Sequence, residues 1–422
     1  MILDDPLIAP SASLPFSIDA PPTAAYIHIP FCRRRCYYCD FAVSIVGDRP
    51  PLSQSGQQQY GAIAEYVDVL CQEIRHTPNV GQPLQTVFFG GGTPSLLTLA
   101  QLDRILTTLD QHFGIASEAE RSIEVDPDAV DADKIAGYAA LGMNRVSLGA
   151  QAFQLEVLQA CGRTHTPDDI RRTVAHLHQA GINNVSLDLI SGLPHQTADL
   201  WQASLEQAIA LDPTHLSIYD LTIEPETAFG RWYEAGETPL PSDQATAEFY
   251  DGARQQLTAA GFRHYEISNY GRSGYECQHN LVYWHNAAYY GFGMGAASYT
   301  HRQRYVRPRT RSAYFAWVKA MIQGGYRLEV PSDTPHDVFL DTVMVGLRLA
   351  EGLNLGAIAH YFGANYAQRL RQILRPYQAQ GWVWMAESSD DVHHLGLTDP
   401  DGFLFSNVML STVFQQFEPA EP

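Results

Sequence analysis

Short runs of β-branched, aromatic and small residues alternate with segments of helical periodicity through the first 260 residues of this 422-residue chain. The runs cover 26–29, 86–89, 122–125, 145–148, 185–190 and 215–219, and the helical segments lie near 60–76, 99–112, 131–141, 167–180, 197–210 and 242–260. This alternation predicts parallel strands joined by crossover helices, because the helices cover the outer face of such a sheet. Six β-α units predict an α/β fold whose sheet closes partly into a (β/α)6 barrel.

Unusual residues follow five of these runs at the point where each predicted strand ends. A cysteine-rich loop follows the first run. The other four runs are followed by Gly90-Gly91-Gly92-Thr93-Pro94, Asp126-Pro127, Gly149-Ala150-Gln151 and Ser191-Gly192-Leu193-Pro194. Since the carboxyl ends of parallel strands meet at one edge of the sheet, where such folds place their sites, we expect one shared site there.

The pattern changes after residue 260. An aromatic and arginine-rich extension covers 261–330 and contains a glycine-rich stretch at 291–295 and arginines at 302, 304, 307, 309 and 311. Residues 331–422 show helical periods near 336–350, 354–363 and 366–380 and then a short β wing, which predicts a small helical, winged-helix-like domain. The chain is therefore divided into a disordered tail at 1–20, a core at 21–260, the extension and this C-terminal domain. The Gln- and Ser-rich stretch at 53–59 is expected to be a mobile loop.

Charge and composition exclude several classes of protein. The chain has 27 basic and 46 acidic residues and a formal charge of −19, so nucleic acid is not expected as a partner. The first 20 residues contain three aspartates and no basic residue, unlike a signal or transit peptide. No apolar stretch approaches the roughly 20 residues that cross a bilayer. We expect a cytoplasmic protein.

Three of the six cysteines, Cys32, Cys36 and Cys39, have the spacing C-x3-C-x2-C directly after the first strand. Structural zinc takes four protein ligands, and His28 is a candidate for the fourth. A [4Fe–4S] cluster also has four ligands, so three cysteines would leave one iron open for another ligand. Both readings, a zinc-stapled binding protein and an iron–sulfur protein, stay open on spacing alone. The other cysteines, at 71, 161 and 277, are expected to be buried structural thiols.

The cysteine spacing after the first strand of a β-α repeat resembles that of the radical S-adenosylmethionine (SAM) superfamily. The resemblance implies that SAM chelates the open iron and that an electron from the cluster splits it to a 5′-deoxyadenosyl radical. Over residues 24–410 the chain resembles the group that contains oxygen-independent coproporphyrinogen III oxidases and haem chaperones. The motifs are Tyr-Ile-His-Ile-Pro-Phe-Cys, Phe-Phe-Gly-Gly-Gly-Thr-Pro, Ile-Glu-Val-Asp-Pro, Gly-Met-Asn-Arg-Val-Ser-Leu-Gly-Ala-Gln, Cys-Gly-Arg and Asp-Leu-Ile-Ser-Gly-Leu-Pro.

The same resemblance implies, position by position, which residues contact SAM. These are Tyr26, Gly91, Gly92, Thr93, Glu124, Gln151, Arg163 and Asp188. Their chemistry suits the ligand: glycine allows a close backbone approach, carboxylates bind an ammonium or ribose hydroxyls, and a guanidinium pairs with a carboxylate. His28 shares a strand face with Tyr26 by period-two alternation and is expected to face the same cofactor.

Two features separate the oxidases from the haem chaperones. The oxidase motif continues C-x3-C-x2-C-x-C, whereas this chain has Phe41 at the last position. His279-Asn280-Leu281-Val282-Tyr283-Trp284 matches the H-N-x-x-Y-W motif of the chaperone group, which implies that His279 is an axial haem ligand. The expected function is therefore a haem chaperone, with coproporphyrinogen III oxidation as the alternative.

These readings also imply partners. Haem and an unidentified haem-acceptor protein follow from the chaperone reading, and the arginines at 302–311 are candidates to pair with haem propionates. The tract Arg33-Arg34-Arg35 is a candidate to guide an acidic electron donor such as a flavodoxin or ferredoxin. A homodimer is expected for a carrier with an aromatic haem site.

Overall fold

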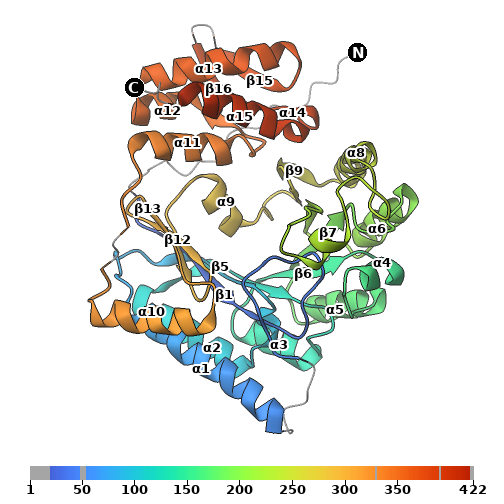
Figure 1. Cartoon of the computed structure of the whole chain (residues 1–422), viewed down its shortest axis with the longest axis vertical. Helices are drawn as coiled ribbons and strands as arrows, with labels where there is room; N and C mark the ends of the chain where they lie inside the picture. Colours follow the sequence, from blue (N-terminus) through green and yellow to red (C-terminus); the bar gives the residue numbers. More distant parts are fainter. Residues whose placement is uncertain (1–19, 48–53, 328–329, 389–390, 419–422) are drawn as a thin grey trace.

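The computed structural model describes residues 20–47, 54–327, 330–388 and 391–418 (Figure 1). The tail expected at 1–20 lies outside these residues except for its last position. None of the helices in the described ranges is long and apolar enough to span a bilayer.

Six parallel strands form the centre of the molecule. They are β1 (Ala24–Ile29), β4 (Leu84–Gly91), β5 (Ile115–Val125), β6 (Arg145–Gln151), β7 (Asn184–Ser191) and β8 (His215–Asp220). Each pairs in parallel with the next in this order. The predicted α/β fold with a partial (β/α)6 barrel is confirmed.

Helices cover the outer face of this curved sheet (Figure 1). They are α1 (Gln54–His76), α2 (Leu99–Phe113), α3 (Ala132–Ala140), α5 (Pro167–Gln179), α6 (Ala198–Ala210) and α8 (Asp243–Ala259). Thr98 and Thr166 begin α2 and α5 with capping boxes, which satisfy amide groups that a helix leaves unpaired at its start. Strand residues such as Ile27 and Val87 share one hydrophobic core with Leu70 of α1.

The prediction of a mobile loop at 53–59 is wrong for the residues that the structure describes. Residues 54–59 form the first turns of α1. Glutamine is a good helix former, and the helix continues directly into the predicted segment at 60–76, so low complexity alone did not indicate a loop here.

Short elements surround the carboxyl ends of the barrel strands. They are β2 (Phe31–Cys32), β3 (Ser44–Ile45), the 3-10 helix η1 (Pro94–Leu96), α4 (Leu155–Ala160) and α7 (Ala228–Trp232). β2 and β3 pair in parallel and close the base of the cysteine loop at 33–43.

The extension runs from one edge of the sheet to the other. Its elements are β9 (Arg263–Glu266), β10 (Asn269–Gly271), α9 (Gln278–Trp284), β11 (Tyr290–Phe292), β12 (Ala297–Thr300), β13 (Gln303–Val306) and α10 (Arg311–Gln323). β10 pairs antiparallel with β8 at one edge, and β11 pairs in parallel with β1 at the other. The short helix α9 connects these two edges and lies between the barrel and the C-terminal domain (Figure 1).

One predicted property of the extension is wrong. Arg307 was a candidate to pair with a haem propionate, yet it is buried and pairs with buried Glu73 of α1, with Nε 2.7 Å from the carboxylate. Tyr314 and the amide of Gly293 donate to the same carboxylate. A buried guanidinium needs such a partner, so this arginine fastens the extension to the barrel and cannot meet a propionate at the surface.

The C-terminal region has its own hydrophobic core, which includes Phe339, Leu370 and Met409. Its elements are α11 (Pro335–Gly346), β14 (Leu353–Asn354), α12 (Leu355–Phe362), α13 (Ala364–Ala379), β15 (Val383–Ser388), β16 (Asp391–Leu397), α14 (Asp401–Leu404) and α15 (Ser406–Phe417). The predicted helices and β wing are present, and the wing has three strands. The predicted boundaries at residues 260 and 330 fall between α8 and β9 and between α10 and α11.

Candidate functional site

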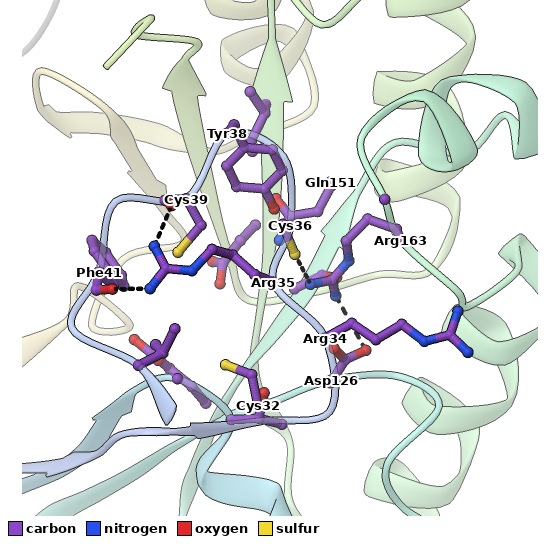
Figure 2. A pocket seen from close by; sticks show the side chains of 18 of the residues that line it. Cys32, Arg34, Arg35, Cys36, Tyr38, Cys39, Phe41, Asp126, Gln151 and Arg163 are labelled. Carbon is purple, nitrogen blue, oxygen red and sulfur yellow. Dashed lines mark hydrogen bonds and ion pairs between the residues drawn. The ribbon is translucent and has the colours of Figure 1, made fainter. Parts of the chain in front are cut away.

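A cavity of about 390 Å³ opens at the carboxyl ends of the barrel strands (Figure 2). Its volume is that of a small-molecule site. The predicted residues that line it are Cys32, Cys36, Cys39, Gly91, Gly92, Thr93, Glu124, Gln151, Arg163 and Asp188. Tyr26, the remaining residue predicted to contact SAM, does not line it. The rim expected from the sequence therefore lines one cavity, and Tyr26 lies outside it.

The cysteine loop presents its three thiols to the same space, as Figure 2 shows. Burial raises the pKa of Cys32 to about 12, although Thr93 donates a hydrogen bond that opposes the shift. Burial also raises the pKa of Cys39. Thiols of this kind stay protonated until a metal binds, and a bound metal would displace their protons.

The arrangement of the three thiols can be compared with what a metal group needs. Among the described residues, no three His, Cys, Asp or Glu side chains are grouped to hold one metal ion. In a [4Fe–4S] cluster each cysteine binds a different iron, so the three sulfur atoms need not converge on a point. Gly92 leaves the necessary room, because a Cβ there would lie 2.9 Å from the Cys32 sulfur. The residues fit a four-iron cluster.

His28, the candidate fourth zinc ligand, has both ring nitrogens engaged. Its Nδ1 lies 3.1 Å from the Tyr26 hydroxyl, and its Nε2 lies 3.1 Å from the carbonyl oxygen of Ala42. The side chain is buried beneath Gly91, where a Cβ would lie 2.5 Å from the imidazole ring. His28 therefore supports the cysteine loop from below, and its expected position facing the cofactor is not seen.

Two carboxylates form the floor of the cavity. Glu124 accepts a hydrogen bond from the Gly91 amide at 3.0 Å, and the Ser147 hydroxyl lies 2.8 and 2.9 Å from the two oxygens of Asp188. Burial, and then the charge of Asp188, raise the pKa of Glu124 to about 8. Burial also raises the pKa of Asp188. Burial and mutual repulsion therefore disfavour two charged carboxylates here, and a cationic group such as an ammonium would relieve this repulsion.

Arg163 was predicted to hold the SAM carboxylate, and here it connects the loop to the barrel. Its guanidinium lies 3.0 Å from the Gly149 carbonyl, 3.1 Å from Asp126 and 3.5 Å from the Cys36 sulfur (Figure 2). Burial alone would raise the pKa of Asp126, but Arg163 and His165 reverse this and lower it to about 2. Asp126 is thus a charged partner for Arg163 that the sequence placed at the rim without assigning it a role.

Gln151 has an unusual backbone. Its φ is +63°, a left-handed value that non-glycine residues rarely adopt, and a bulge in the β6–β7 pairing precedes it. A Cβ on Gly149 would lie 2.9 Å from the Gln151 amide nitrogen, so the glycine makes room for this side chain. Such strain is typical of a position held for function.

Tyr26 lies below the cavity floor. A Cβ on Gly90 would lie 2.8 Å from its ring and 3.0 Å from Glu124, so both side chains pack closely on Gly90. Burial raises the pKa of Tyr26 well above its usual value. Tyr26 therefore supports the floor by packing on Gly90 beside Glu124, and its hydroxyl contacts His28.

His279 lies at the other end of the barrel, on α9, with only 1% of its surface exposed. Its Nδ1 lies 2.7 Å from the Thr86 hydroxyl, and its Nε2 lies 2.8 Å from the Tyr283 hydroxyl. The ring stacks on Phe88, with centroids 5.2 Å apart. Burial lowers the pKa of His279 to about 3, so the imidazole is neutral.

Glu120 of β5 fixes the start of α9 against the barrel. Its carboxylate accepts hydrogen bonds from the amides of Gln278 and His279, both at 3.1 Å. An anion at a helix N-terminus is favourable, because the first amides of a helix have no partner in the helix itself. Glu120 lies outside the strand predicted to begin at 122, because β5 begins at Ile115.

Other residues of the cavity were also missed. Ser147 follows from period-two alternation, since Arg145, Ser147 and Gly149 lie on one face of β6. Tyr219 and Asp220 line the cavity from the end of β8, the one predicted strand whose following residues were not considered.

Comparisons with known proteins agree with this geometry. The model of the Radical SAM superfamily matches residues 26–208, and that of the HemN C-terminal domain matches 333–388. A solved structure of coproporphyrinogen III oxidase (HemN) from Escherichia coli has the same fold, with a TM-score of 0.77 and 24% identity over 94% of this chain and 91% of that one. The fold and the cysteine cavity define a protein of the radical SAM superfamily.

Relatives at higher identity narrow the class. A protein named heme chaperone HemW from Synechocystis is 43% identical over 408 residues, which cover 94% of this chain and 97% of that protein. The protein of the same name from Bacillus subtilis is 32% identical over 377 residues, covering 88% and 96%. The chain belongs to the HemW family.

Proposed function

We propose that this protein binds haem and passes it to an acceptor protein. The observation that carries the proposal is the likeness, over 94% of the chain, to a protein named heme chaperone HemW. Two features of the chain support it: the His279 motif on α9, and Phe41 at the position where the oxidases have a further cysteine.

The cavity is proposed to hold a [4Fe–4S] cluster and SAM. Cys32, Cys36 and Cys39 would bind three irons and leave the fourth to SAM. When bound, such a cluster supplies the electron that cleaves SAM. The glycine backbone at 91–92 with Thr93, the floor carboxylates Glu124 and Asp188, and the side chains of Gln151 and Arg163 would surround the cofactor, with Tyr26 supporting the floor from below.

His279 is proposed to be a haem ligand in a second conformation of the protein. In the present conformation its Nε2 is occupied by the Tyr283 hydroxyl, and the side chain is buried. Ligation therefore requires that this hydrogen bond breaks and that α9 moves. The amide of Asn286, just beyond α9, donates to the Thr342 hydroxyl of α11, so the C-terminal domain is connected to this movement.

Haem titration of three variants tests this assignment. His279→Ala should weaken haem binding at least tenfold, with loss of the histidine-ligated optical spectrum. Tyr283→Phe should strengthen binding about fivefold, because one hydrogen bond no longer competes for Nε2. His178→Ala, which removes an exposed imidazole from the last turn of α5, far from α9 in the chain, is the control and should bind haem as the wild type does. Equal binding by His279→Ala and wild type would place the haem ligand elsewhere.

The alternative function is oxygen-independent oxidation of coproporphyrinogen III. The common fold with HemN is the observation that keeps it in view, since the two chains align over most of their length. Anaerobic conversion of coproporphyrinogen III to protoporphyrinogen IX by the reconstituted protein would replace the chaperone as the main function.

The expected partners stay predictions with direct measurements. Anaerobic reduction assays with flavodoxin and ferredoxin test the electron donor, and sedimentation tests the homodimer. Guidance by the arginine tract loses some support, because Arg33 pairs with Asp128 at 3.6 Å and Arg35 donates to backbone carbonyls. Cell fractionation tests the cytoplasmic location.

A further inference from the structure

Four consecutive backbone carbonyl groups follow the turn of the cysteine loop, and each accepts a hydrogen bond from a side chain. They belong to Cys39, Asp40, Phe41 and Ala42. Arg35 donates to the first and third, both at 3.2 Å. Arg309 donates to the second at 2.9 Å, and His28 donates to the fourth at 3.1 Å. No strand or helix covers 39–43, so these side chains replace the partners that regular structure would provide.

Arg309 differs from the other two donors because it comes from the extension, 269 residues away from Asp40. The glycine-rich stretch brings it close. A Cβ on Gly295 would lie 2.9 Å from the Cβ of Ala42, so only glycine lets the extension approach the loop this closely. The Gly295 amide donates to the carbonyl of Pro308, the residue before Arg309. The positive φ of Gly295, +77°, is part of this turn.

We propose that Arg309 is a positioning residue for the iron–sulfur cluster. The carbonyl that it holds belongs to the residue after Cys39, so fixing this carbonyl limits where the Cys39 sulfur points. Arg35 acts from within the loop, whereas Arg309 connects the loop to a region that Arg307 and Glu73 fasten to the barrel. The extension thereby keeps the third cysteine in place. This inference rests on the cluster part of the proposed function and is independent of haem.

The test compares variants after anaerobic reconstitution with iron and sulfide. Arg309→Gln should lose the cluster absorption about threefold faster than wild type in the presence of an iron chelator, the effect of one lost charge-assisted hydrogen bond at an exposed position. Hydrogen–deuterium exchange should rise at residues 40–44. Arg309→Lys keeps a donor and a positive charge, so it should restore most of the wild-type rate.

Arg311→Gln is the matched control. It makes the same change of charge two residues away, at the start of α10, and should behave as wild type. The electron paramagnetic resonance signal of the reduced cluster should broaden in Arg309→Gln and stay sharp in Arg311→Gln. Equal rates for Arg309→Gln and Arg311→Gln would overturn the inference, as would a fall in melting temperature that accounts for the faster loss. Failure of the wild type to take up iron would instead overturn the proposed cluster.

Discussion

The two ends of the barrel are built in opposite ways. At the carboxyl ends of the strands, glycines and a loop without regular structure leave a cavity of about 390 Å³ lined with thiols and carboxylates. At the other end, α9 packs on the barrel and buries His279, and the polar groups at its start have partners: Glu120 accepts the first amides, and two hydroxyls contact His279. The carboxyl end, here called the open end, is preorganised for a ligand. The other end, here called the sealed end, must change conformation before His279 can bind a ligand.

The largest expected effect is loss of iron from the open end. Cys32→Ala should remove essentially all iron from the reconstituted protein, because two thiols do not retain a cluster that needs three. Iron and sulfide analysis with the absorption spectrum measures this. Cys277→Ala is the control at the sealed end, where the thiol is buried near Glu120. It should keep full iron, and iron loss in Cys277→Ala would mean that the two ends are not separate.

The sequence predicted the open end far better than the sealed end, for physical reasons. Cysteine spacing and glycines at strand ends are local features, so they indicated Cys32, Gly92 and their neighbours, which line one cavity. The state of His279 depends on Thr86, 193 residues away in the chain, and no local pattern indicates that contact. Arg307 was misassigned for the same reason, because Glu73, its partner, lies 234 residues away.

The fold shows the same contrast. The β-α alternation predicted the six barrel strands and their order, since each crossover returns the chain to the neighbouring strand. The path of the extension, with β10 at one edge of the sheet and β11 at the other, depends on pairing between distant segments. Periodicity carries no information about such pairing.

The second prediction concerns how firmly α9 is held at the sealed end. Glu120→Gln should lower the free energy of opening α9 by about 2 kcal/mol, because an amide group replaces a carboxylate that accepts two backbone hydrogen bonds. Amide exchange in α9 should then be roughly 30-fold faster, as mass spectrometry can measure.

The matched control for this change lies on the same strand. Glu118→Gln alters an exposed carboxylate of β5 and should leave exchange in α9 unchanged. If α9 exchanges in Glu120→Gln as slowly as in wild type, the carboxylate does not hold the helix. If haem binding also strengthens in Glu120→Gln, opening of α9 limits access to His279.

The smallest expected effect is at Glu124, in the floor of the cavity between the two ends. Its folded pKa of about 8 lies above the ordinary value of 4.5, so its contribution to stability is fully present below about pH 4.5 and is lost as the pH rises through 8. Compared with Glu124→Gln, the cofactor-free wild type should lose about 1 kcal/mol, or about 2 °C in melting temperature, between pH 5 and pH 8.5. This figure is less than the full shift implies, because the cavity admits water. If the melting temperatures of the two proteins change with pH in the same way, Glu124 is solvated and ionised over this pH range. The floor of the cavity would then be open to water.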